Sequence, residues 1–164
     1  MIRKLNLLIL TLFGIGNSKY APGTVASFTT CLIYIYFYNI EVDILLLIIF
    51  TSAIFIYSVY SIDNFKNSFS EIDAKEIVVD EFIGQSIPVL TIYSLVEKNN
   101  LNHFILFTFI AFILFRIFDI WKPYPIKKID KEIKNGFGII LDDVVAGIYS
   151  IIVLLIAFFL INYA

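Results

Sequence analysis

The most informative stretch of this chain lies near its C-terminus and reads Leu141-Asp142-Asp143-Val144-Val145-Ala146-Gly147. Beyond it the sequence stays apolar almost to the last residue. Adjacent carboxylates at the mouth of such a run are costly to remove from water, so they need a cation, a proton or solvent beside them. The stretch therefore predicts a membrane helix that opens on an acidic site.

Two further apolar stretches also carry acids at one end. Asp80 and Glu81 precede the run that starts at Phe82, and Asp119 lies near the end of the run from Leu101 to Trp121. Helix capping is an alternative explanation for Asp142, which could be the N-cap of the last helix. Capping explains Asp119 poorly, because an acid near a helix C-terminus opposes the helix dipole. The three acidic positions together therefore favour a shared site.

The composition indicates a membrane protein and excludes several other classes. The 164 residues are 60% hydrophobic and 17% aromatic with a mean hydropathy of +0.89, whereas soluble domains are roughly 45–50% apolar. A net charge of -2 gives no basis for nucleic-acid binding. Cys31 and His103 are single, so a disulfide or a histidine-ligated metal cluster cannot be built, and Cys31 is interpreted as a small buried or lipid-facing hydrophobe. Any metal chemistry must use oxygen ligands.

The hydropathy pattern predicts an all-α, polytopic membrane helical bundle of four to five membrane helices, forming one domain over residues 1–164. The expected helices cover residues 24–40, 42–62, 82–96, 101–121 and 144–163. The segment 82–96 is short and contains Pro88, so whether it crosses fully stays open. The apolar residues 5–13 are too few to span roughly 30 Å of hydrocarbon, and we expect an interfacial or re-entrant segment there.

Lysine and arginine gather in three regions, which the positive-inside rule places on the cytoplasmic face. These regions contain Arg3, Lys4 and Lys19, then Lys66 and Lys75, and then Lys122, Lys127, Lys128, Lys131 and Lys134. If five helices cross the membrane, all the acids named above lie at the same cytoplasmic boundary. The sequence thus predicts a cytoplasmic-side acidic site.

Carboxylates at one interface suit a hard divalent cation such as Mg²⁺, which commonly bridges one or two carboxylates and a substrate phosphate. The expected ligands come from Asp80, Glu81, Asp142 and Asp143. Consecutive helical residues diverge by about 100°, so we expect each doublet to direct one carboxylate into the bundle and to leave the other as a cap or supporting group.

Cationic and hydroxyl side chains near these acids are candidates for phosphate binding. Arg116 precedes Asp119 by three residues, and either a structural ion pair or a grip on phosphate fits that spacing. Lys122 and Lys127 belong to a Trp-, Pro- and Lys-rich segment, which is typical of an interface anchor and also attracts anionic lipid headgroups. Thr24 and Ser27 would supply hydroxyl donors at the start of a helix, after a glycine-containing loop.

Four motifs, in order, resemble the phosphatidylglycerophosphatase A family. They are Ala21-Pro22-Gly23-Thr24, Glu76 to Gln85, Phe115 to Ile126, and Gly138 to Gly147. The resemblance implies a bacterial inner-membrane, Mg²⁺-dependent lipid phosphatase that converts phosphatidylglycerophosphate to phosphatidylglycerol and phosphate. Ala26, Asn135 and Tyr124 depart from the residues common in the family, and these changes concern loop geometry rather than the carboxylates.

The resulting hypothesis assigns Mg²⁺ to some of Asp80, Glu81, Asp142 and Asp143. Asp119 would be a base or an additional ligand, and Arg116 and Lys122 would neutralise charge that develops on the phosphate. Direct attack by water and a phosphoenzyme both remain open. The main alternative is a small cation transporter that uses intramembrane carboxylates, and a third is a scaffold subunit without catalysis.

Overall fold

The computed structural model describes residues 2–65 and 76–163, which form seven α-helices and one short 3-10 turn. The elements are α1 (Ile2–Leu10), η1 (Ile15–Asn17), α2 (Pro22–Asn39), α3 (Ile44–Phe65), α4 (Val79–Leu95), α5 (Leu101–Trp121), α6 (Ile126–Glu132) and α7 (Gly136–Tyr163). The described residues contain no strand, so the all-helical prediction is confirmed. Lys66 and Lys75, two of the expected cytoplasmic lysines, lie outside the described residues.

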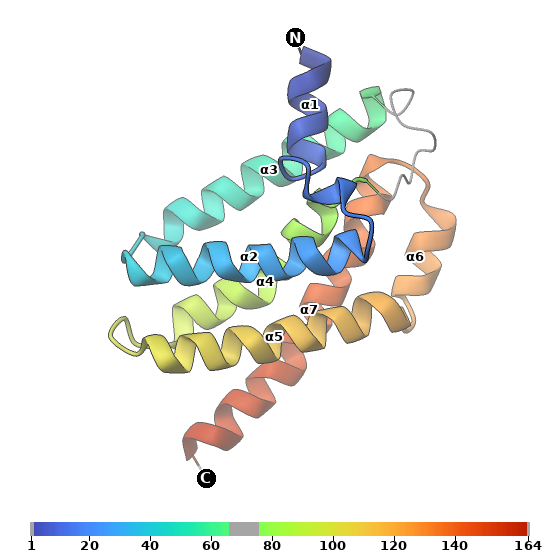
Figure 1. Cartoon of the computed structure of the whole chain (residues 1–164). Helices are drawn as coiled ribbons and strands as arrows, with labels where there is room; N and C mark the ends of the chain where they lie inside the picture. The colour runs from blue at the N-terminus through green and yellow to red at the C-terminus, as the bar shows by residue number, and fades with distance from the viewer. Residues whose placement is uncertain (1, 66–75, 164) are drawn as a thin grey trace.

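The long helices form a bundle whose two ends differ (Figure 1). The starts of α2, α4 and α7 and the end of α5 gather at one end, beside α6, while the α2–α3 and α4–α5 connections lie at the other. α1 runs across the direction of α2 and α5 rather than along it. It has nine residues, too few to span roughly 30 Å of hydrocarbon, and its placement at a membrane interface stays a prediction.

The close crossing of α4 and α7 organises the bundle. A Cβ on Gly147 would lie 2.5 Å from the carbonyl oxygen of Gly84, and a Cβ on Gly84 would lie 2.7 Å from the carbonyl oxygen of Asp143. Real side-chain atoms do not approach that closely, so the two backbones touch only because both positions are glycine. Small residues are the usual means of such contact between membrane helices. The crossing brings the first turn of α4 beside the second turn of α7.

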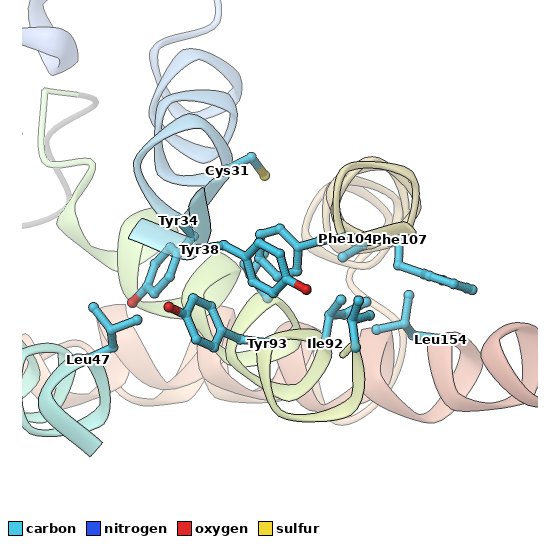
Figure 2. Close-up of a cluster of buried hydrophobic side chains, with 12 residues drawn as sticks. Cys31, Tyr34, Tyr38, Leu47, Ile92, Tyr93, Phe104, Phe107 and Leu154 are labelled. Atoms are coloured by element: carbon cyan, nitrogen blue, oxygen red, sulfur yellow. The ribbon is translucent and has the colours of Figure 1, made fainter. Parts of the chain in front are cut away.

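Aromatic packing fills the end of the bundle that carries the α2–α3 and α4–α5 connections (Figure 2). The rings of Tyr38 and Phe104 stack with centroids 4.0 Å apart, and Tyr93 packs edge-on against both. Cys31 is buried in this cluster and is a free thiol, which confirms its interpretation as a small hydrophobe.

Three helical stretches among the described residues are long and apolar enough to cross a membrane: Ile44–Asn64, Leu101–Trp121 and Gly136–Leu160. Their outward faces expose large apolar side chains, among them Leu45, Ile49, Ile113 and Leu160, and such extended apolar surface needs lipid or protein to cover it. The helices α2 and α4, of 18 and 17 residues, do not belong to this set. The expectation of four to five crossings therefore stays a prediction.

The bounds of α2, α3 and α4 differ from the expected ones by one to three residues, and the start of α7 differs by more. The last helix begins at Gly136 rather than near residue 144, so Asp142 lies inside the helix and its interpretation as the N-cap is wrong. Asp63 of α3 accepts a hydrogen bond of 2.7 Å from the backbone N–H of Gly136, and Asn135 accepts one from that of Gly138. These contacts satisfy backbone N–H groups at the start of the helix, in place of an acidic N-cap. The segment expected to be a loop, residues 122–143, also contains the helix α6.

Candidate active site

Three carboxylates from α4 and α7 form the centre of the site. Ligand oxygens of Asp80, Glu81 and Asp143 all lie within 4.8 Å of one another. Asp143 is 4% exposed, and Oδ1 of Asp80 and Oε2 of Glu81 are buried without a hydrogen-bond partner among the described residues. Buried acids in this number, with oxygens left unpaired, require a compensating cation or proton. The donor set is all oxygen, so these residues fit a hard divalent cation such as Mg²⁺.

Gly23 allows the start of α2 to approach this triad of carboxylates. A Cβ at position 23 would lie 2.0 Å from Oε1 of Glu81. Any larger residue would therefore displace the carboxylate or the helix. This contact gives a structural reason for glycine in the Pro22-Gly23-Thr24 motif.

Asp142 points away from the triad, toward α5 and α6. Its Oδ2 lies 2.7 Å from Nζ of Lys122, and the same Nζ lies 3.1 Å from Oδ1 of Asp130. Burial by itself lowers the pKa of Lys122, but the hydrogen bond and the charge of Asp142, followed by those of Asp130, outweigh it and raise that pKa above its ordinary value. Lys122 is therefore a persistent cation between two acids. The Asp142–Asp143 doublet divides as expected, with one carboxylate in the triad and one in a supporting ion pair. The same expectation is wrong for Asp80 and Glu81, because both carboxylates belong to the triad.

Arg116, which also lines the site, joins α5 to α2. Its Nη1 lies 2.6 Å from Oδ2 of Asp119 and 3.5 Å from Oγ of Ser27. Ser27 in turn donates a hydrogen bond of 2.8 Å to the carbonyl oxygen of Gly23. Nε of Arg116 is buried and has no partner among the described residues. The guanidinium is thus held in place and still has a donor to offer.

These groups line one cavity of about 420 Å³. Its lining includes all four predicted metal ligands, the three predicted catalytic residues, and Thr24. Ser27 lies behind Arg116 rather than in the lining, and Lys127 is exposed on α6, outside it. Sequence reasoning missed Asp130 as a site residue and did not single out Lys134, although both line the cavity. They belong to a mixed charge run of α6 and its surroundings, a pattern that is ordinarily a solvated helix face.

Comparisons with known proteins show the family to which this chain belongs. The family model described as Phosphatidylglycerophosphatase A matches residues 8–158. A Haemophilus influenzae phosphatidylglycerophosphatase A is 36% identical over 86% of this chain and 81% of its own length. The Escherichia coli protein of the same name is 30% identical over 84% and 74%.

A Bacteroides thetaiotaomicron protein, provisionally named as a phosphatidylinositol-3-phosphatase, is 34% identical over 93% of both chains. No solved structure matches the chain. The family model covers most of the sequence, including every residue that lines the acidic cavity. The chain therefore belongs to the phosphatidylglycerophosphatase A family.

Proposed function

We propose that this protein is a Mg²⁺-dependent phosphatase that hydrolyses phosphatidylglycerophosphate to phosphatidylglycerol and inorganic phosphate. Family membership supports a lipid phosphatase, and the relatives named phosphatidylglycerophosphatase A suggest the substrate. The observation that carries the proposal is the triad of Asp80, Glu81 and Asp143, which shares one cavity with Arg116 and Lys122. Carboxylates can hold a metal ion that binds a phosphate, and the neighbouring cationic side chains suit the charge of that phosphate.

Mg²⁺ bound by the triad would polarise the phosphoryl group and lower the pKa of a coordinated water. The protein's own residues would orient and stabilise the substrate. Arg116, which lines the cavity, would bring the charge of its guanidinium to the phosphate oxygens, where negative charge develops in the transition state. Lys122 would supply a second positive charge in the same cavity. Asp119, which lines the cavity and orients Arg116, would accept a proton from the attacking water.

We further propose that α2, α3, α4, α5 and α7 cross the inner membrane of a bacterium, with the cavity at the cytoplasmic face. This arrangement is supported by the gathering of α6 and the starts of α2, α4 and α7 at one end of the bundle (Figure 1). Lys19, Lys122 and Lys134 belong to segments at that end, and positively charged short segments favour the cytoplasmic side. α1 would then lie along the interface.

The cation-transporter alternative gains no support from the structure. A transport path needs polar groups through the depth of the membrane, whereas the predicted site acids all line one cavity at one end of the bundle. The provisional name of the Bacteroides thetaiotaomicron relative raises a different question, which is the identity of the lipid phosphate. A phosphoinositide is therefore included as a competing substrate below.

The deciding experiment measures phosphate release by the purified protein in mixed micelles. The substrates are phosphatidylglycerophosphate, phosphatidic acid and phosphatidylinositol 3-phosphate, each with Mg²⁺ and with EDTA. We expect Mg²⁺-dependent release that is fastest from phosphatidylglycerophosphate. Full activity in EDTA would refute the metal requirement, and faster release from phosphatidylinositol 3-phosphate would refute the substrate.

A further inference from the structure

An apolar groove of about 710 Å³ opens on the outer face of the bundle along α5. Its apolar α5 side chains are Phe112, Ile113, Ile117, Ile120 and Trp121. These positions recur at intervals of three to four residues and so share one face of the helix. Phe28 of α2 packs edge-on against Phe112, with ring centroids 5.9 Å apart, which joins α2 to this face. We refer to this feature as the lateral groove.

The lateral groove meets the acidic cavity at two side chains. Thr24 and Arg116 line both spaces, whereas every other lining residue belongs to only one of them. Arg116 is fixed at this junction by Asp119 and Ser27. A ligand that touches Arg116 through a phosphate in the cavity therefore has an apolar surface immediately beside it.

Under the proposed topology the groove faces lipid. α5 is a candidate membrane span, and Ile117 and Trp121 are 47% and 72% exposed. Tryptophan is enriched where the hydrocarbon meets the headgroup layer, and Trp121 occupies the end of α5 nearest the cavity. The groove thus extends from the headgroup level along the hydrocarbon.

A phospholipid has chemical groups in the same order as these two spaces, with a phosphate joined through a short glycerol to acyl chains. Drawing a chain into water costs about 0.8 kcal/mol per CH₂ group, so a membrane phosphatase must bind the phosphate while the chains stay in an apolar environment. We propose that the lateral groove holds an acyl chain of the substrate while its phosphate occupies the acidic cavity. The inference rests on the proposed function and adds the route by which the substrate enters, sideways from the bilayer between α2 and α5.

Filling the groove tests this inference. Ile113→Trp places a bulky ring in it, and Ile105→Trp makes the same change on the same helix outside it. The two isoleucines are matched in exposure, at 42% and 41%. The measured quantity is the kcat/KM for dioleoyl phosphatidylglycerophosphate divided by the kcat/KM for the dihexanoyl lipid. We expect Ile113→Trp to lower this ratio about tenfold, the smallest effect usual for a misfit in an apolar pocket. Ile105→Trp should leave the ratio unchanged.

The outcomes separate the two proposals. If the wild-type protein releases no phosphate from either lipid, the proposed function fails. If it turns both over and Ile113→Trp leaves the ratio unchanged, or Ile105→Trp changes it equally, the groove proposal fails alone. An Ile113→Trp protein that does not fold shifts the test to the fluorescence measurement on the wild-type chain.

That measurement uses Trp121, because the chain contains a single tryptophan. Vesicles with a small fraction of a brominated-acyl phosphonate analogue of the substrate, whose C–P bond resists hydrolysis, are mixed with the protein and Mg²⁺. Occupancy of the groove brings bromine to Trp121, so we expect stronger quenching than with the same fraction of brominated phosphatidylcholine. Equal quenching by the two lipids would show non-selective lipid contact and would overturn the proposal. The absence of quenching by either lipid would indicate that a second copy of the chain covers the groove, and it would also overturn the proposal.

Discussion

The two ends of the bundle bury polar groups in opposite ways. At the end shown in Figure 2, the hydroxyl of Tyr93 donates to the carbonyl oxygen of Val42 at 2.6 Å, and that of Tyr34 lies 2.7 Å from Oγ1 of Thr51. At the other end, oxygens of Asp80 and Glu81 are buried without partners among the described residues. Satisfied polar groups add stability, and unsatisfied ones reduce it. The contrast supports the proposal that the acidic end binds a ligand that the aromatic end does not need.

The largest expected effect comes from Asp80→Asn. Loss of one triad carboxylate should lower kcat/KM about 100-fold or more, the scale seen when a preorganised electrostatic group is removed from a transition state. In EDTA the same variant should melt at a higher temperature than wild type, because it relieves repulsion among buried acids. Activity assays and thermal unfolding with and without Mg²⁺ measure the two effects.

The matched control is Glu97→Gln, which removes an exposed acid at the opposite end of the bundle. Mg²⁺ that binds the folded protein should raise the melting temperature of wild type, and Glu97→Gln should change neither this rise nor the activity. If Asp80→Asn kept that rise, the comparison between the two ends would lose its basis.

Lys122→Met is expected to have the next largest effect. It leaves Asp142 and Asp130 without their cation, which for a partly buried pair should cost about 2 kcal/mol, between the values for exposed and buried pairs. The folded-state pKa of Lys122 is raised, so its stabilising contribution is complete below its unfolded pKa of about 10.4 and declines as the pH rises toward its folded pKa. The deficit of the variant should therefore be constant from about pH 6 to 9, as measured by denaturation at each pH.

Lys122→Arg supplies the comparison variant for this prediction. It keeps a charge beside both acids and should recover most of the lost stability. If the loss of stability in Lys122→Met were smaller at neutral pH than in the rest of this pH range, the lysine would not be the persistent cation inferred from the geometry.

Tyr93→Phe probes the opposite end and should reduce stability without affecting catalysis. It leaves two carbonyl oxygens, those of Val42 and Phe37, without the hydroxyl that donates to them. We expect a loss of about 1–2 kcal/mol, with phosphate release within twofold of wild type. Tyr36→Phe, at an exposed position of α2, should change stability by less than about 0.5 kcal/mol. A large loss of activity in Tyr93→Phe would contradict the division between the two ends.

The smallest expected effect belongs to Lys127→Ala. Lys127 is exposed and lies outside the cavity lining, so its contribution reduces to general attraction for anionic lipid, about 1 kcal/mol per basic residue. The loss should be at most about fivefold in KM and should vanish at high salt, because solvent-exposed charges are screened. A salt-independent loss would indicate direct contact with the substrate and would return Lys127 to the site.

Local sequence patterns predicted a large part of this architecture. The helix Leu101–Trp121 has the expected bounds, and the acids were correctly associated with the ends of apolar runs, because hydropathy and helix period are properties of neighbouring residues. The start of α7 was missed because glycines such as Gly136 and Gly138 are typical of loops. In the structure they can begin a helix because Asp63 and Asn135 accept hydrogen bonds from their N–H groups. Asp130 was missed for a similar reason, because only the ion pair with Lys122 distinguishes it from other charged residues of its helix.

The sequence by itself determined an all-helical chain with segments apolar enough to cross a membrane, carboxylates at the ends of those segments, and no histidine or cysteine set for a metal. Only the tertiary structure decided which carboxylates meet. Asp80, Glu81 and Asp143 come together because α4 and α7 touch at Gly84 and Gly147, while Asp142 turns to Lys122. Contacts between residues so distant along the chain depend on how whole helices pack, and no local pattern contains that information.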